Sequence, residues 1–578
     1  MKTDNTTIQF LKRKIYLKGL LSLTVLIALL AIDLAATAQS TDRNLILERT
    51  YKAGISTISG NVKDATQQVT YIDGLGRTLQ AVNAQASPKM SGTVPADLVV
   101  HTEYDANGRV SKQYSVYPVQ GNGSYQSTAA TAAVSYYNNG SNCCVPNDRG
   151  YLLNEYEPLP GGRLKKQYQP GSDRAVEFTY GGNATDEVKR YTVSGTTLQN
   201  SGNYGAGQLS WVETKDENNN SSREFQDKNG RVVLKRVYLD SDWLSTYYVY
   251  DDYSQLRFVL QPKYQDDANL DLYAFKYQYN SKGLLVSKSI PGGGTTTMVY
   301  DERDRLIEST DGRSITTYIK YDDLNRTIET GLKEGANQNA ITKTQYDTYT
   351  YSPSFGDVAA FVSAGTGYAS NYRSEVKGKS TVTANRILNP DGTYGAWLYA
   401  TTYYDDRFND IQLVRSLFDI GGTATERKSL SLRFDGRIDK EITVQQTGSG
   451  DYSVEKIYAY DHSDRQVSAR YIVKKGTTTK KDVFLSANRY NAVGQLKNKY
   501  LHSSDAGNSY REKLDYCYTP RAFLSKITGA GSTGESFGVE LRYSNPSFGT
   551  AQYNGNIAEM LWKRSGNWIG YKLEYDKA

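Results

Sequence analysis

The chain has few side chains of the kinds that act as general bases or bind transition metals. Its 578 residues include three histidines, His101, His462 and His502, and none stands in a His-Glu-x-x-His arrangement. His462 occupies a free position in a turn motif, which favours a solvated loop residue over a catalytic base. Adjacent aspartates, as at 251–252, lack the alternating oxygen ligands of a calcium loop. We therefore predict no catalytic residue and no metal site.

A glycine-rich segment imitates a dinucleotide-binding loop. Residues 529–534 read Gly-Ala-Gly-Ser-Thr-Gly, which satisfies the pattern G-x-G-x-x-G. Such a loop must open a helix whose N-terminus faces the phosphates. Residues 537–543 alternate as a strand does instead. The segment is predicted to be a hairpin loop, and no cofactor is expected.

The three cysteines are too few for a disulfide framework. Cys143 and Cys144 are adjacent in a loop-like stretch, and Cys517 lies far along the chain. One of the pair could bridge to Cys517 only if the fold brings them together, and connectivity cannot be read from sequence.

The dominant pattern is a turn signature that recurs through the chain. It consists of Asp or Asn, two free residues, then Gly, Asn or Asp, usually followed by Arg. The eight copies are Asp73-Gly76-Arg77, Asp105-Gly108-Arg109, Asp227-Gly230-Arg231, Asn280-Gly283, Asp301-Asp304-Arg305, Asp322-Asn325-Arg326, Asp461-Asp464-Arg465 and Asn491-Gly494. In six copies a tyrosine precedes the Asp or Asn: Tyr104, Tyr279, Tyr300, Tyr321, Tyr460 and Tyr490.

The spacing of the signature predicts the tip of a β-hairpin. Asp or Asn suits the first position of a type I turn, and three residues later Gly, Asn or Asp tolerates a positive φ. A type I turn followed by such a residue is a common hairpin connection. The arginine that begins each return strand is predicted to stack on a neighbouring tyrosine or to pair with the turn Asp. A tyrosine- and arginine-lined surface that binds glycans or peptides is the alternative.

Composition agrees with a long array of strands. The 49 tyrosines can cover a half-buried sheet, because each ring is apolar and each hydroxyl can remain wet. Glycine is abundant at 50 residues and proline sparse at 13, as expected where turns are many and strands keep their backbone donors. The predicted fold class is all-β.

The N-terminus predicts a secretory signal peptide over residues 1–38. Basic residues precede an apolar run over 19–32, and Ala36-Thr37-Ala38 offers a cleavage site between Ala38 and Gln39. An uncleaved anchor is the alternative, but Asp33 interrupts the short apolar run. The segment holds five Lys or Arg and two Asp, so its removal takes the formal charge from +6 to +3. This balance argues against nucleic-acid binding, and no later stretch is apolar enough for a membrane helix.

Two further domains are predicted. Residues 39–180 form a small β-rich N-terminal domain, and residues 181–578 form the array of hairpins. Within the first, the stretch from Gly121 to Asp148 is poor in aliphatic residues and rich in Gly, Ser, Asn and Ala. It is predicted to be an exposed insertion.

The tandem Tyr-Asp-x-x-Gly-Arg hairpins resemble the YD repeats of bacterial Rhs-type proteins, relatives of the teneurins. The stretch from Tyr71 to Pro118 is similar to an uncharacterised domain that often precedes such repeats in exported proteins. The resemblance implies a long spiralling sheet that forms part of a hollow β-shell, which in that family commonly encloses a variable C-terminal toxin. It implies no catalysis by the repeats themselves.

The resulting expectation is an exported structural scaffold, secreted or on the cell surface. Its expected partners are the rest of an Rhs shell or a toxin on another segment, with no membrane contact after signal removal. The chain ends with Tyr575-Asp576-Lys577-Ala578, the first half of another copy, so truncation before the Rhs core and any toxin is expected. Two alternatives remain: a surface adhesin that binds glycans or proteins, and a carbohydrate-active enzyme with two convergent carboxylates.

Overall fold

The structure is a computed structural model that describes residues 42–52, 64–89, 94–142, 145, 147, 149–350, 360–417, 424–447, 450–531, 534–564 and 566–576. The predicted signal peptide and its cleavage site, Cys143, Cys144 and part of the glycine-rich segment 529–534 lie outside the described residues. Cys517 is disulfide-bonded.

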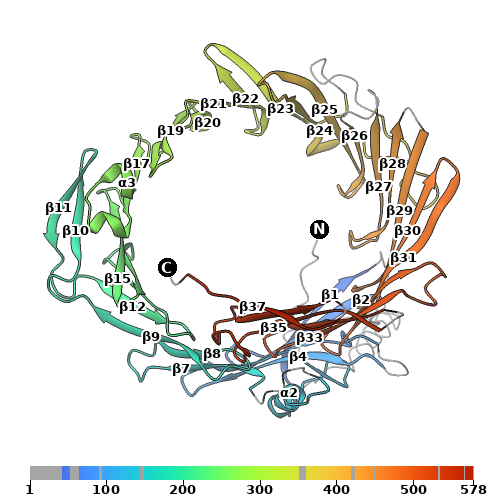
Figure 1. Ribbon diagram of the computed structural model, residues 1–578, viewed down its shortest axis with the longest axis horizontal. Helices are drawn as coiled ribbons and strands as arrows, with labels where there is room; N and C mark the ends of the chain where they lie inside the picture. Colours follow the sequence, from blue (N-terminus) through green and yellow to red (C-terminus); the bar gives the residue numbers. More distant parts are fainter. Residues whose placement is uncertain are drawn as a thin grey trace, which may run out of the picture. The chain divides into compact units, whose positions relative to one another are not determined.

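The described residues form a nearly continuous succession of strands (Figure 1). The first half comprises β1 (Asn44–Tyr51), β2 (Ala65–Ile72), β3 (Thr78–Asn83), β4 (Asp97–Tyr104), β5 (Val110–Tyr114), β6 (Tyr117–Val119), α2 (Ala129–Tyr137), β7 (Tyr151–Tyr156), β8 (Leu164–Tyr168), β9 (Ala175–Gly182), β10 (Lys189–Ser194), β11 (Thr197–Asn203), β12 (Ser210–Lys215), β13 (Ser221–Gln226), β14 (Val232–Leu239), β15 (Asp242–Tyr250), β16 (Leu256–Leu260), η1 (Pro262–Gln265), α3 (Leu270–Tyr273), β17 (Ala274–Tyr279), β18 (Leu285–Ile290) and β19 (Gly294–Tyr300). The second half comprises β20 (Leu306–Thr310), β21 (Thr316–Tyr321), β22 (Thr327–Glu334), β23 (Asn337–Asp347), β24 (Val376–Leu388), β25 (Tyr394–Tyr404), β26 (Asp410–Ser416), β27 (Thr425–Leu432), β28 (Ile438–Thr447), β29 (Gly450–Tyr460), β30 (Gln466–Lys475), β31 (Thr478–Tyr490), β32 (Leu496–Ser503), β33 (Glu512–Tyr518), β34 (Leu524–Gly531), β35 (Gly534–Arg542), β36 (Glu559–Lys563) and β37 (Ile569–Lys572).

Most of these strands pair antiparallel with their neighbours in the chain. The run from β12 to β27 is an unbroken series of such pairs, and so is the run from β30 to β37. Strand β9 pairs with β12, because β10 and β11 form a separate two-stranded hairpin. All other described strands belong to one antiparallel sheet. The predicted all-β class and the long array of hairpins are confirmed.

Residue contacts divide the chain into two compact units. The first unit comprises Met1–Ala175, Ser431–Glu441 and Val454–Glu574, and the second comprises Val176–Leu430, Ile442–Ser453 and Tyr575–Ala578. The first unit therefore joins the N-terminal strands to strands near the end of the chain. The predicted boundary between residues 180 and 181 stays a prediction.

The core of the first unit shows that the stretch from Gly121 to Asp148 is not merely an exposed insertion. It contains helix α2, which buries Ala129, Ala133, Tyr136 and Tyr137 and lies beside β4 in Figure 1. Alanine has the highest helix propensity, and its small side chain lets a helix approach a sheet closely. The lack of large aliphatic residues was therefore a misleading sign of exposure.

The core of the second unit lies between the main sheet and the β10–β11 hairpin. Phe225, Leu234 and Leu260 are fully buried, and Val193 and Leu198 of the hairpin pack against their cluster. The hairpin thus covers one face of strands β12 to β17 with a second layer.

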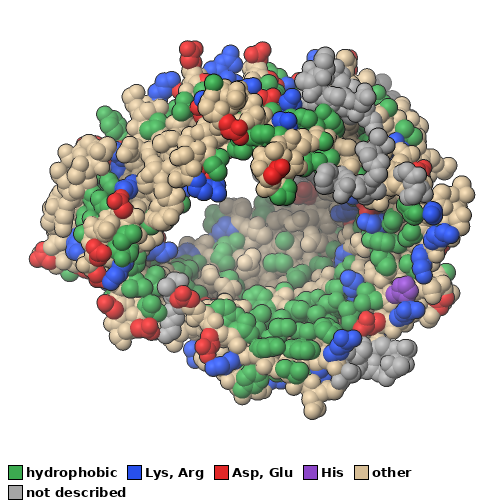
Figure 2. Space-filling model, turned by 45° about the horizontal axis from the view of Figure 1, so that its top comes forward, with side chains coloured by type: hydrophobic (Ala, Val, Ile, Leu, Met, Phe, Trp, Pro, Cys, Tyr) green, Lys and Arg blue, Asp and Glu red, His purple; other side chains and the backbone are tan. Residues whose placement is uncertain are grey.

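Elsewhere the sheet is only half covered. Figure 2 shows hydrophobic side chains, tyrosine included, gathered over broad areas of the surface with charged side chains among and around them. Most positions in strands β17 to β23 are intermediate in exposure rather than buried. Burial of apolar surface alone therefore stabilises this part of the sheet little, and other contacts must hold its strands together.

Strands β22 and β23 approach each other closely at Gly331, where there is no room for a Cβ atom. A Cβ added there would collide with the backbone carbonyl oxygen of Asn339 and lie 2.8 Å from Cα of Ala340. We expect Gly331→Ala to destabilise the β22–β23 hairpin by about 1–3 kcal/mol through overpacking. Native-state hydrogen exchange of that hairpin would measure the loss. Gly74→Ala is the matched control, because no atom lies within 4 Å of its added Cβ, and an equal effect of both variants would contradict the prediction.

Candidate functional site

Six of the eight repeated turns are built around a carboxylate at their first position. In the copy at 301–305, Asp301 Oδ1 accepts the backbone N–H groups of Arg303 and Arg305, each at 2.9 Å, and Oδ2 accepts Arg305 Nε at 2.7 Å. The same three bonds recur in the copies that begin at Asp73, Asp105, Asp227, Asp322 and Asp461.

These bonds lower the pKa of the turn carboxylates of Asp73, Asp105, Asp301 and Asp322. The backbone N–H of Arg305, followed by its guanidinium, holds the pKa of Asp301 below its ordinary value. A carboxylate that is already ionised and occupied by three donors is a poor general acid. The turn Asp residues are therefore arranged for structure.

The fourth position of every copy adopts the left-handed conformation. The φ angles are 80° at Gly76, 78° at Gly108, 76° at Gly230, 81° at Gly283, 61° at Asp304, 64° at Asn325, 62° at Asp464 and 87° at Gly494. Only Gly, Asn and Asp adopt this region readily, which explains the restricted choice at this position. The extra residue creates a β-bulge, as where Tyr300 pairs with Leu306.

In the six copies that have it, the arginine after the turn links one hairpin to the next. Arg305 lies with its Cζ 4.8 Å from the ring centroid of Tyr321, and its Nη1 donates to Asn325 Oδ1 at 2.9 Å. Equivalent ring contacts join Arg77 to Tyr104, Arg109 to Tyr156, Arg231 to Tyr250, Arg326 to Tyr346 and Arg465 to Tyr490. Arginine therefore both pairs with its own Asp and stacks on a tyrosine of the following hairpin.

The tyrosine completes the link in the opposite direction. Tyr321 donates its hydroxyl to the backbone carbonyl of Leu306 at 2.9 Å, the residue directly after Arg305. We call this contact the Tyr–carbonyl bridge: a tyrosine hydroxyl that bonds the first residue after the preceding turn. It recurs from Tyr104 to Thr78, Tyr156 to Val110, Tyr279 to Leu256, Tyr300 to Leu285, Tyr346 to Thr327, Tyr460 to Ile438, Tyr490 to Gln466 and Tyr543 to Leu524. Tyr404 makes a similar bond to Ser380, which lies within β24.

The same backbone turn occurs at seven further places in the described residues. Each has the paired backbone bonds of the turn and a positive φ at the fourth position. These turns span 216–220, 251–255, 311–315, 389–393, 405–409, 433–437 and 519–523. A tyrosine directly precedes three of them, at Tyr250, Tyr404 and Tyr518. The turns at 216–220 and 389–393 fit the signature, whereas the others have Ser, Phe or Ala at the fourth position, or Arg433 or Thr519 at the first.

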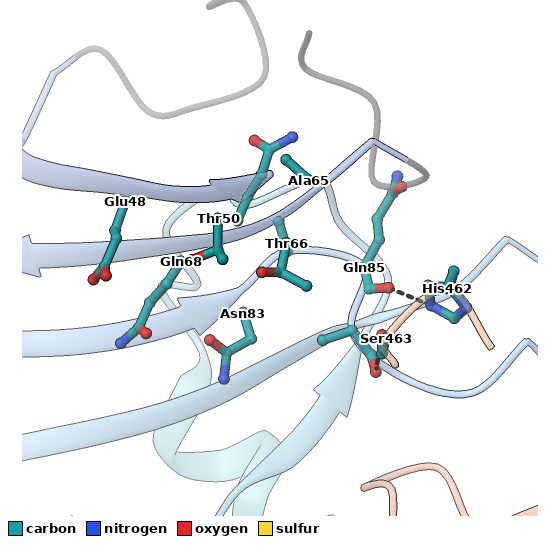
Figure 3. Close-up of a pocket in the computed structure, with 12 residues that line it drawn as sticks. Glu48, Thr50, Ala65, Thr66, Gln68, Asn83, Gln85, His462 and Ser463 are labelled. Carbon is teal, nitrogen blue, oxygen red and sulfur yellow. Dashed lines mark hydrogen bonds between the residues drawn. The ribbon is translucent and has the colours of Figure 1, made fainter. Parts of the chain in front are cut away.

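A cavity of about 220 Å³ lies in the first unit, where β1, β2 and β3 meet the turn at 461–465 (Figure 3). Glu48, Gln68 and Asn83 face it from three adjacent strands, since Gln68 pairs with both Glu48 and Asn83. Figure 3 shows the Gln85 carbonyl oxygen accepting a hydrogen bond from His462 at one end. The lining is largely polar and contains a single carboxylate, that of Glu48.

None of the three histidines is placed for catalysis. His101 stacks on Tyr114 with ring centroids 5.6 Å apart, and burial lowers its pKa, which favours the neutral ring. His462 is half-buried against Gln85 instead of solvated as predicted, because its turn packs on another part of the chain. His502 adopts a positive φ of 54° and its carbonyl accepts the N–H of Arg511.

The part of the chain that the structure describes contains no group of three or more His, Cys, Asp or Glu able to hold a metal ion. The predicted turn residues are not gathered into one site; they occupy successive hairpins, one copy each. Within the described ranges, no helix is long and apolar enough to cross a membrane.

Comparison with known families agrees with this geometry. A family model described as RHS Repeat matches residues 279–316, which contain two successive bridged turns. A second, described as Domain of unknown function (DUF6443), matches residues 47–186. The chain contains an RHS repeat. No curated protein matches it significantly in sequence.

Solved structures are similar to this chain over most of its length. The crystal structure of TcdB2-TccC3-TEV is 13% identical over 92% of this chain and 27% of that chain, with a TM-score of 0.41. The Photorhabdus luminescens Tc holotoxin pore is 12% identical over 93% of this chain and 27% of that chain, with a TM-score of 0.42. The present chain thus spans about a quarter of the length of these proteins.

Removing a single bridge hydroxyl tests its contribution to the array of hairpins. We expect Tyr321→Phe to weaken the joint between β20 and β21 by about 1 kcal/mol, because the Leu306 carbonyl loses its donor. Hydrogen exchange of peptides covering these strands would report the change. Tyr253→Phe is the matched control, since Tyr253 is 87% exposed; indistinguishable exchange in the two variants would count against the bridge.

The ion pair between Arg326 and Asp347 predicts an acid-sensitive joint. Two guanidinium nitrogens of Arg326 contact the Asp347 oxygens at 2.8 and 2.6 Å, and together with the Gly378 N–H they lower the pKa of Asp347 to about 2 from 3.8. Because the folded-state pKa is depressed, the stabilisation is present above pH 3.8 and is lost as the pH falls through about 2.

Asp347→Asn should remove this pH dependence. Urea unfolding followed by exchange of β23 peptides at several pH values between 5 and 2 would measure it. The control is Asp323→Asn at an exposed turn tip, which should retain the wild-type profile. An unchanged profile in Asp347→Asn would refute the assignment.

Proposed function

We propose that this protein is an exported, non-catalytic scaffold. Its sheet, joined by Tyr–carbonyl bridges, would form part of an RHS-type shell. The shell would enclose or present an effector carried by another segment or polypeptide. The observation that carries the proposal is the Tyr–carbonyl bridge with its stacked arginine, which joins successive hairpins in both units. The Asp, Arg and Tyr side chains of the repeat are engaged in these contacts. They therefore hold neighbouring hairpins together rather than take part in catalysis.

Two features support export. Residues 1–38 have the basic, apolar and small-residue segments of a signal peptide. Cys517 is disulfide-bonded, and structural disulfides persist mainly in oxidising compartments.

Processing at Gln39 is the expected outcome of export. We predict that the protein recovered from outside the cytoplasm begins at Gln39, and that Ala38→Trp prevents cleavage there because the bulky side chain replaces the small one next to the cut. N-terminal sequencing and intact-mass measurement would decide. Gln39→Ser is the control and should still be processed. Wild-type protein that retains Met1 in that fraction would contradict the export proposal.

Protease protection tests the scaffold proposal. The full chain would be purified from its host, and any co-purifying polypeptide exposed to protease in the wild type and in a variant with Tyr300, Tyr321 and Tyr346 changed to Phe. We expect slower digestion of that polypeptide with the wild type, because loosened hairpin joints open the sheet. Equal digestion, or no associated polypeptide, would argue against the scaffold role. Selective glycan-array binding lost in Gln68→Ala would instead favour a carbohydrate-binding protein.

A further inference from the structure

The two free residues at each turn tip fall into two classes. In six of the eight copies both residues are exposed. These exposed tips are at 74–75, 106–107, 228–229, 281–282, 302–303 and 323–324. In the copies at 461–465 and 491–494 both residues are half-buried. In the next turn Pro520 is buried and Arg521 is half-buried. Three consecutive turns therefore have covered tips.

The first covered tip bonds the loop after β3. His462 donates its Nε2 hydrogen to the Gln85 carbonyl at 2.8 Å, and Ser463 donates its hydroxyl to the Ala86 carbonyl at 3.0 Å. Arg465 Nη1 also donates to the Ala86 carbonyl at 2.8 Å. Both tip residues thus supply donors to a loop that offers backbone acceptors.

A buried charge cluster strengthens this contact. The Asp464 side chain is 5% exposed, lies 3.9 Å from Lys52 Nζ, and also pairs with Arg437 at 2.6 Å. Lys52 follows β1 and donates to the His462 carbonyl. By contrast, Asp304 occupies the same turn position in an exposed copy, where its side chain is 46% exposed and pairs with Lys282. A buried carboxylate requires paired cations, so Asp464 belongs with its covered surroundings.

The next two tips use different chemistry. Ala492 and Val493 pack against the apolar cluster that contains Tyr114 and helix α2. Arg521 donates from Nε to the Pro170 carbonyl at 3.2 Å, and a Cβ added to Gly171 would lie 3.2 Å from Pro520 Cγ. The three tips therefore meet the N-terminal strands through polar, apolar and proline-containing contacts in turn.

We propose that the N-terminal domain is a docking site for three consecutive hairpins of the same chain, and that their tip residues determine which hairpins it binds. The first residue, the fourth residue and the return-strand residue build the turn in every copy, so we assign the choice of contact to the two tip residues between them. His462 and Ser463 donate hydrogen bonds to backbone carbonyls of the loop, and Val493 packs against an apolar cluster.

Exchanging tips between covered and exposed turns tests the proposal in the full chain. His462→Lys with Ser463→Asn reproduces the exposed tip at 228–229, and the reverse exchange, Lys228→His with Asn229→Ser, is its matched control. Both variants retain the turn-forming residues. We expect the first to accelerate hydrogen exchange of the 84–89 loop about tenfold, since two net hydrogen bonds are lost, and the control to leave it unchanged.

A second exchange uses the apolar tip. Val493→Asn gives the Ala-Asn tip found at 106–107, and Asn107→Val is its control. Exchange should accelerate in α2 about tenfold with the first variant, because an amide is placed against an apolar cluster, and stay unchanged with the second. Effects confined to the facing peptides support tip recognition. Wild-type protection in both covered-tip variants, or equal acceleration in β22 and β23, would overturn it.

Discussion

The array depends on the hydroxyl of each repeat tyrosine donating to the backbone carbonyl just after the preceding turn. That carbonyl lies beside a β-bulge, where the extra residue interrupts the ladder. The tyrosine supplies a donor there, and the arginine of the preceding turn lies on its ring. Tyr, Asp and Arg therefore act as one unit divided between two hairpins, which explains why these residue types recur together.

This arrangement suits a sheet that buries little aliphatic surface. A tyrosine ring contributes apolar contact, while its hydroxyl is satisfied without full burial. Exposed ion pairs alone would add little. In the turns, however, the arginine side chain is already held by the carboxylate of its own turn. Its contact with the tyrosine ring therefore costs little further side-chain entropy. Cohesion thus comes from many small, repeated joints rather than from one large core.

The sequence predicted what depends on local chemistry. The positive φ at Gly76 or Asn325 follows from the residue type, and the all-β class follows from the spacing of such turns. Contacts over hundreds of residues were not predictable, which is why His462 was expected to be solvated. Helix α2 was missed because alanine-rich segments lack the large apolar residues that mark a buried face. The turn at 311–315 was missed because Ser314 adopts the φ expected of glycine.

The bridge has an evolutionary consequence. Because each one joins only adjacent hairpins, the array resembles a chain of nearest-neighbour couplings. Duplicating or deleting one hairpin would create one new joint and leave the rest as they were. Chain length can therefore change by whole copies during evolution without redesign of the sheet. The three hairpins that contact the N-terminal strands are the exception, because gain or loss of a copy among them would disrupt those contacts.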